Sequence, residues 1–147
     1  MYAVEKRRDL QHAAEEIEQL FADLWEVFPF SRGFRRGFRP QIDCYRTEDT
    51  VVVVVELPGV DPDSVQVVAG PRALAIAGER PRPKDSGHYR QMEIDYGPFQ
   101  RQVSWEDEVD AEAATASYER GMLRITLPIA PKRAPQERVP IAVRTGP

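Results

Sequence analysis

Side chains able to do nucleophilic or acid–base chemistry are sparse and scattered in this sequence. His12 and His88 lie in a predicted helix and a predicted loop, and no serine stands in a nucleophile elbow. There is no glycine-rich phosphate loop and no metal-ligand spacing. Cys44 is the only cysteine, which excludes an intramolecular disulfide and a cysteine-cluster zinc site. We therefore expect no enzyme activity and no cofactor or metal.

Residues 30–40, FSRGFRRGFRP, are the one stretch whose residue types could bind nucleic acid. Arginine and aromatic side chains can stack on single-stranded bases. The glycine spacing makes a flexible linker equally well, and the net charge of −4 speaks against a general nucleic-acid binder. We favour the linker and expect no nucleic-acid partner; RNA binding stays an alternative, which an absence of salt-sensitive binding to single strands would dismiss.

The segment Val139-Pro140-Ile141-Ala142-Val143 has the pattern of an apolar docking peptide. If it is extended, Val139, Ile141 and Val143 point to one side and could enter a groove or lie along a sheet edge. Pro140 favours the extended form and lowers its ordering cost. The segment lies in a proline-containing tail, residues 131–147, which we expect to be a mobile extension. Folding back onto its own domain is equally compatible with the spacing.

An amphipathic helix is predicted from Leu10 to Phe28, with Asp9 as its cap and Pro29 after its end. Its apolar stripe has a four-three spacing and comprises Leu10, Ala14, Ile17, Phe21, Leu24 and Phe28. The stripe packs either on the core of its own domain, or on a copy of itself or another protein. We favour the second for a terminal arm that a linker separates from the domain.

After Pro40 the sequence changes to short apolar runs between turn signals, which predicts an all-β sandwich or barrel. The central strand is Val51 to Val55, where both faces are apolar, so a second layer must cover it, from its own chain or from another subunit. The other expected strands are 42–46, 65–68 and 73–77, and a hairpin of 114–120 and 122–127 turning at Gly121. Residues 79–96 are too long for a hairpin loop. Within them 88–94 could be an extended strand that pairs with another subunit.

These residues together resemble the α-crystallin domain of the small heat shock proteins, of the bacterial type. The resemblance covers about residues 40–130. Its two strongest signals are Glu56-Leu57-Pro58-Gly59-Val60 and a closing hairpin from Ala116 through Gly121-Met122-Leu123-Arg124-Ile125-Thr126-Leu127-Pro128. The other matching pieces are Pro40-Gln41-Ile42-Asp43, Leu74-Ala75-Ile76-Ala77-Gly78-Glu79-Arg80, Tyr89-Arg90, Glu93, Tyr96-Gly97-Pro98-Phe99-Gln100-Arg101 and Val109-Asp110.

The resemblance implies an immunoglobulin-like antiparallel β-sandwich over residues 40–130, with a helical arm and linker at 1–39 and a flexible extension at 131–147. It implies a dimer formed by exchange of the strand 88–94, with Arg101 at the interface beside a carboxylate. The interface residues are then His88, Tyr89, Arg90, Met92, Ile94 and Arg101. It also implies that Val139, Pro140, Ile141 and Val143 anchor a neighbouring dimer in a groove, for which the candidates are Val65, Val67, Ala116 and Tyr118.

The function so implied is that of an ATP-independent holdase, which binds partly unfolded proteins under heat or other stress and prevents their aggregation. We expect the client-binding residues to be Leu20, Phe21, Leu24, Trp25, Phe28, Phe30, Phe34 and Phe38. The main alternative is a co-chaperone or scaffold sandwich that binds one folded partner. The lone cysteine and the absence of a leader or a membrane-spanning run fit a cytoplasmic protein with no stable membrane insertion.

Overall fold

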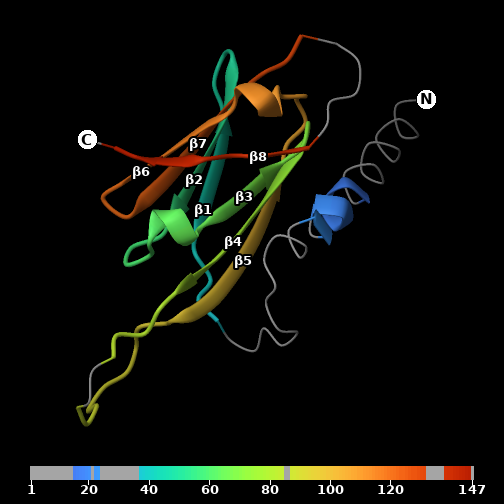
Figure 1. The fold of residues 1–147 in the computed structure, drawn as a ribbon. Helices are drawn as coiled ribbons and strands as arrows, with labels where there is room; N and C mark the ends of the chain where they lie inside the picture. The colour runs from blue at the N-terminus through green and yellow to red at the C-terminus, as the bar shows by residue number, and fades with distance from the viewer. Residues whose placement is uncertain (1–14, 21, 24–36, 85–86, 132–137, 147) are drawn as a thin grey trace.

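The computed structural model describes residues 15–20, 22–23, 37–84, 87–131 and 138–146, and these form a two-layer antiparallel sandwich with a short helical segment (Figure 1). One sheet has the strand order β1-β2-β7-β6-β9 and the other β5-β4-β3-β8. The strands are β1 Ile42–Arg46, β2 Thr50–Glu56, β3 Gln66–Ala69, β4 Ala73–Arg80, β5 Gly97–Ser104, β6 Thr115–Glu119, β7 Met122–Pro128, β8 Val139–Pro140 and β9 Val143–Thr145. Two 3₁₀ turns, η1 Pro62–Ser64 and η2 Ala111–Ala113, connect strands. The predicted sandwich is thereby confirmed.

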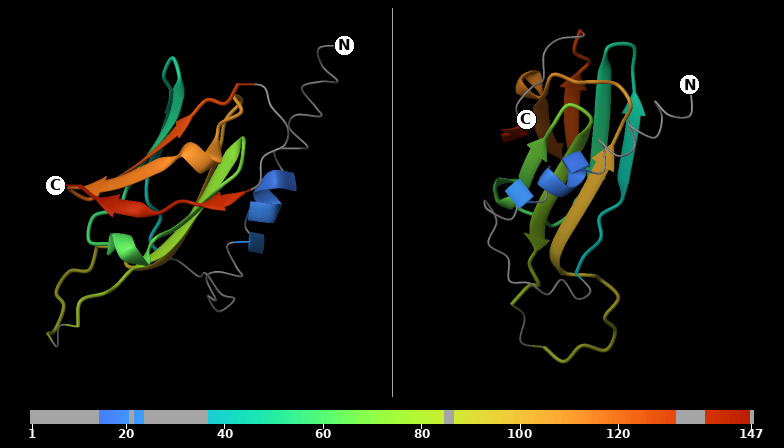
Figure 2. Two further views of the ribbon diagram at one scale, coloured as in Figure 1. Left: turned by 45° about the horizontal axis from the view of Figure 1, so that its top comes forward. Right: turned by 90° about the vertical axis from the view of Figure 1, so that its right-hand side faces the viewer.

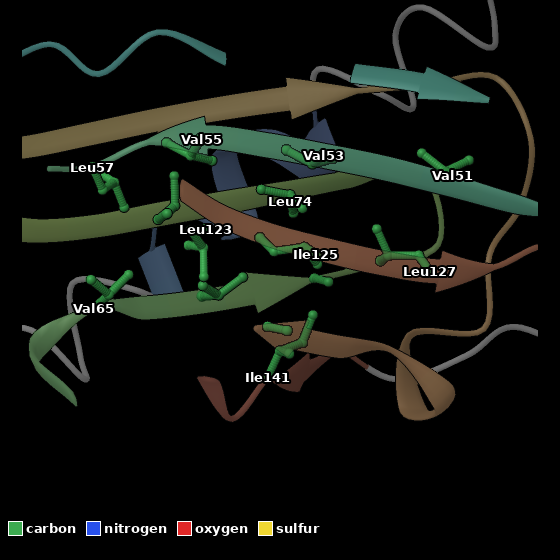
Figure 3. Packing of buried hydrophobic residues seen from close by; sticks show 14 of the residues in the cluster. Val51, Val53, Val55, Leu57, Val65, Leu74, Leu123, Ile125, Leu127 and Ile141 are labelled. Carbon is green, nitrogen blue, oxygen red and sulfur yellow. The ribbon is translucent and has the colours of Figure 1, made fainter. Parts of the chain in front are cut away.

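The core lies between the inner faces of the two sheets (Figure 3). Alternate residues of β2 point inward, and Val51, Val53 and Val55 are at most 1% exposed. They pack with every second residue of β7 and β4, where the inward set is Leu123, Ile125, Leu127, Leu74 and Ile76. This period of two places one side of each strand in the core.

The outer face of β2 is covered by its own chain. Val52 is 4% exposed although it faces away from the core, and Val54 is half-buried. Tyr45 on β1 pairs with Val52, and Arg124 on β7 pairs with Val54. The Arg124 guanidinium donates to the Tyr45 hydroxyl at 2.8 Å, so the two side chains meet across β2. The sequence allowed this face to be covered either by the chain itself or by another subunit, and in the isolated chain it is covered by the chain itself.

The two motifs that carry the strongest resemblance lie against each other. Arg120 and Gly121 have φ values of 53° and 77°, as a two-residue type I′ hairpin between β6 and β7 requires. A side chain at Gly121 would come within 3.1 Å of the Pro58 backbone, and the Leu57 N–H donates to the Gly121 carbonyl at 2.7 Å. Glycine is therefore needed at 121 both for the turn and for this close approach.

The connection from β4 to β5 extends away from the sandwich (Figure 1). In its described part, residues 81–84 and 87–96, no strand is formed. The expectation of an extended strand at 88–94 is therefore not met in the isolated chain. The physical reason is that a strand needs a hydrogen-bonded partner, and no described segment pairs with these residues.

The N-terminal helix is described at residues 15–20 and 22–23, and the rest of the range predicted for it lies outside the described residues. This segment lies on the outer face of the sheet that contains β3 and β4 (Figure 2). Leu20 is fully buried there, with Ile17 beside it. Of the predicted stripe only Ile17 lies among the described residues, and it packs on the sandwich, so packing of the whole stripe on another chain stays a prediction. No helix in the described part is long and apolar enough to span a bilayer.

Candidate docking groove

We call the docking groove the site between β3 of one sheet and β6 of the other that the tail strands β8 and β9 fill. Val65 and Val67 line it from the β3 side and are 6% and 2% exposed. Ala116 lines it from β6 and is 5% exposed, and Tyr118 packs beside it. The four residues predicted as groove candidates therefore lie together. The small side chain of Ala116 leaves room for a branched side chain from a third segment.

The third segment is the chain's own tail, which crosses from one sheet to the other (Figure 1). β8 pairs with β3 in antiparallel fashion, with Val139 opposite Ala69 and Pro140 opposite Val68. The Ile141 N–H donates to the Val67 carbonyl at 3.0 Å. β9 then pairs with β6 in parallel, with Val143 opposite Ala116. The tail thus satisfies backbone groups on two strand edges that would otherwise be open.

The side chains of the tail alternate as an extended docking peptide requires. Ile141 is 8% exposed and belongs to the main core cluster (Figure 3). Val139 and Val143 pack against the same cluster, whereas Pro140 and Ala142 point to solvent. All three predicted apolar side chains contact the sandwich at once. The expectation of a mobile extension is not met at residues 138–146 because this pairing holds them.

The Tyr118 hydroxyl ties the groove to the main turn of the domain. It donates to the Leu57 carbonyl at 2.7 Å from a part-buried position. Leu57 is fully buried and directly precedes the Pro58-Gly59 turn. The hydrogen bond therefore fixes the position of the Tyr118 ring and, with it, one wall of the groove.

The residues predicted for a dimer interface lie on the projecting loop. His88, Tyr89, Arg90, Met92 and Ile94 are all exposed, and Tyr89, Met92 and Ile94 are 51%, 59% and 63% exposed. These three are among the few large apolar side chains that the described residues leave open to solvent. The Tyr89 ring has the Arg82 guanidinium 6.0 Å from its centroid, whereas Met92 and Ile94 belong to neither core cluster.

The base of this loop is held by stacking between arginine and aromatic rings. The Arg80 guanidinium lies 3.7 Å from the centroid of the Phe38 ring, and its Nε donates to the Asp95 carbonyl at 2.8 Å. Phe38 also packs edge to face on the buried Phe99 ring, with centroids 5.9 Å apart. Phe38 is therefore packed on the core in the isolated chain, and its contact with clients stays a prediction.

Arg101 lies apart from the other predicted interface residues, in the middle of β5. Its Nη1 donates to the Pro40 carbonyl. Burial, and after it the charge of Arg39, lowers the pKa of the Arg101 guanidinium. Within the described residues, no carboxylate comes within ion-pair distance of it. A carboxylate partner for Arg101 stays a prediction.

Of the predicted client-binding residues, the structure describes only Leu20 and Phe38, and both are packed against the domain. The other six lie outside the described residues; they are Phe21, Leu24, Trp25, Phe28, Phe30 and Phe34. Across the described ranges, no group of three or more histidine, cysteine, aspartate or glutamate side chains is placed to hold a metal ion.

Sequence reasoning missed the surface on which the helix packs. That surface is the outer face of β4 and its neighbour β3. Ala73, Ala75 and Ala77 are buried there under the helix. The available signal was the choice of small residues on a strand face that would normally be polar if it met water.

Residues 43–144 match the model of the Hsp20/alpha crystallin family. Heat shock protein 16 of Schizosaccharomyces pombe is 32% identical over 85% of this chain and 91% of its own length. The 18 kDa heat shock protein of Streptomyces albus is 36% identical over 68% of this chain and 71% of its own length.

Solved structures agree with this match. Heat shock protein 16.0 from S. pombe superposes with a TM-score of 0.60 at 33% identity, over 69% of this chain and 96% of that one. A small heat-shock protein from Xylella fastidiosa gives a TM-score of 0.57 at 32% identity, over 67% of this chain and 92% of that one.

Proposed function

The chain belongs to the Hsp20/alpha crystallin family of small heat shock proteins, which are non-enzymatic chaperones, and on this premise we propose that it is an ATP-independent holdase. It binds partly unfolded proteins and prevents their aggregation. Unfolding clients expose apolar surface. Each Å² of this surface that the chaperone covers removes roughly 25 cal/mol of the free energy that would otherwise favour association between clients.

One observation carries the proposal: both described ends of the chain fill apolar sites on the sandwich through contacts of a kind that another segment could make. The tail holds its groove by Ile141 and a few backbone hydrogen bonds. The helical segment holds its face through Ile17 and Leu20. Short segments of this kind dock reversibly, so a client or a second copy can replace them, and the released ends then expose their own apolar residues.

The proposal includes self-association of the chain through two contacts between copies. We propose that residues 88–94 of one copy pair with the open edge of β1 on another, which buries Tyr89, Met92 and Ile94. The support is that β1 ends its sheet and that these side chains are exposed in the single chain. Val139, Ile141 and Val143 would then dock in the groove of a neighbouring dimer by the pairing that they show here. For the Xylella protein, the structure is described as a distinct high order structure.

We further propose a separate function for each of three segments of the chain. Residues 1–39 supply client contact through the helical arm, residues 40–130 form the sandwich, and residues 131–147 anchor neighbouring dimers. We place the protein in the cytoplasm, where the exposed thiol of Cys44 stays reduced.

The test is light scattering from a heat-labile client at raised temperature in buffer that lacks any nucleotide. We expect suppression of scattering at near-stoichiometric ratios of subunit to client, and none with an inert control protein at equal mass. Circular dichroism on the same samples shows whether the protein is folded. Unchanged scattering with a folded protein would contradict the holdase and favour a scaffold that binds one folded partner.

A further inference from the structure

The outer face of β3 and β4 carries a second apolar surface, separate from the groove. We call it the alanine face; it consists of Val68, Ala73, Ala75 and Ala77. Val68 and Ala75 pair directly across the two strands, so the surface is continuous. Its side chains are short, which lets a helix come close to the sheet and bury a long side chain fully. Leu20 is 0% exposed on this surface.

Each end of the docked helix is held by a carboxylate that contacts a hydrogen-bond donor or a positive charge on the domain. The Glu16 carboxylate accepts a hydrogen bond from the Arg72 N–H at 3.2 Å, in the turn between β3 and β4. At the other end, Asp23 forms an ion pair with Arg138 at 3.2 Å, and both side chains are 35% exposed. A Cβ atom at Gly70 would collide with the Glu16 carboxylate, so glycine leaves the space that this contact needs.

The contacts define a recognition pattern rather than a single sequence. Glu16, Ile17, Leu20 and Asp23 fall at i, i+1, i+4 and i+7, which places them on one side of a helix. Two apolar residues therefore lie between two carboxylates. Arg138 directly precedes Val139, so the surface is complete only while the tail lies along β3.

We propose that the alanine face, with the Arg72 N–H and Arg138, is a docking site for an acidic amphipathic helix of a client, and that residues 15–23 occupy it in the resting chain. The proposal rests on the holdase function and names the helix class that this site accepts. Partly unfolded proteins keep helices whose apolar sides are exposed, so such ligands are present under stress. A short helix is only marginally stable by itself, and its few contacts make the resident helix displaceable.

The experiment uses full-length chain with Leu20→Asp, which empties the face because a carboxylate cannot be buried among alanines. The probe is a fluorescein-labelled peptide with the sequence of residues 10–28, and its anisotropy is followed. We expect saturable binding to this variant and at least about tenfold weaker binding to the unaltered chain, whose face is occupied. A peptide with Ile17→Asp and Leu20→Asp should not bind.

Four substitutions in the Leu20→Asp chain, two at the site and two as controls, locate the site. Ala75→Arg should abolish binding, whereas Ser117→Arg, an exposed position on the other sheet, should not affect it. Arg138→Glu should weaken binding about threefold or more, and a peptide with Asp23→Arg should restore it. Arg144→Glu, the same charge change further along the tail, should have no effect.

The site is overturned if Ala75→Arg and Ser117→Arg bind the peptide equally, or if the Leu20→Asp chain shows no saturable binding. Because Arg138 is at the surface, its variant tests the site even if Ala75→Arg fails to fold. These readouts need no client protein, so the site and the holdase activity can each fail while the other stands.

Discussion

The strand edges differ between the two sides of the sandwich, which we call the tail side (β8 and β9) and the loop side (β1 and β5). On the tail side, β8 and β9 pair with β3 and β6 and bury Ile141 between the sheets. On the loop side, β1 and β5 end their sheets, and among the described residues no strand pairs with the outer edge of either. Most of β1 is exposed, as are the apolar side chains of the nearby loop.

The difference shows which contacts one chain can complete by itself. The tail carries its own branched side chains to a groove of matching shape, so the tail side needs no second copy to be folded. The loop side combines unpaired backbone with exposed apolar side chains, the two features that drive association between chains. In the single chain, the paired and buried contacts are therefore concentrated on the tail side, and the surface left open to a second copy lies on the loop side.

Replacing Ile141 by alanine should have the largest effect, because it empties the groove on the tail side. We expect the free energy of unfolding to fall by about 2 kcal/mol, measured by urea denaturation. The loss should not depend on protein concentration if the tail docks on its own sandwich, and should depend on it if the tail docks on another copy. Arg144→Ala, at an exposed position in the same tail, is the control; an equal loss there would show that the groove is not occupied.

Tyrosine-to-phenylalanine changes give a matched comparison of the two sides. Tyr118→Phe removes the part-buried hydrogen bond to the Leu57 carbonyl and should cost about 1 kcal/mol. Tyr45→Phe removes the exposed hydrogen bond from Arg124 and should cost under about 0.5 kcal/mol. Thermal unfolding measures both. A larger loss from Tyr45→Phe would contradict the concentration of buried contacts on the tail side.

Ile94→Ser should change the unfolding free energy by less than about 0.5 kcal/mol, because the side chain is 63% exposed. Its effect should instead appear as a lower mass in sedimentation across a dilution series. Glu93→Ser is the neighbouring control. Unaltered mass in the Ile94 variant would place the association surface elsewhere.

Cys44 reports on whether the edge of β1 is covered. The residue is exposed at the surface, yet burial around its thiol raises the pKa of Cys44. Less thiolate is present at pH 8 than for a free thiol, so alkylation by iodoacetamide should be slower and should accelerate as the pH rises through the raised pKa. Protection should increase with protein concentration if a second copy pairs along β1. A rate that matches a free thiol at every concentration would contradict both points.

Much of the fold could be predicted from the sequence because alternation was visible in it. The strand at 42–46 was placed at its observed bounds, and the Gly121 hairpin was recognised from its turn residue. For these two elements one local pattern was enough to identify the element. The groove candidates Val65, Val67, Ala116 and Tyr118 came instead from the family resemblance, together with the small size of the alanine side chain.

The rest depended on pairings that no local pattern encodes. Residues 88–94 have an apolar alternation, but a strand there needs a partner that one chain does not supply. The alanines of β4 are compatible with any close neighbour, so they did not reveal the helix. Phe38 was assigned to a linker from the glycine spacing around it. Its packing on Phe99 joins distant parts of the chain, so no local pattern revealed it.

The crossing of the tail between the sheets also sets the order in which the protein can be completed during synthesis. β3 and β6 are made well before β8 and β9, so the groove exists as two unpaired edges while the chain is still growing. Non-local pairing of this kind forms late, and open edges are where nascent chains meet one another. A polysome making this protein therefore displays many vacant grooves at once, and each is closed only when its own tail is released.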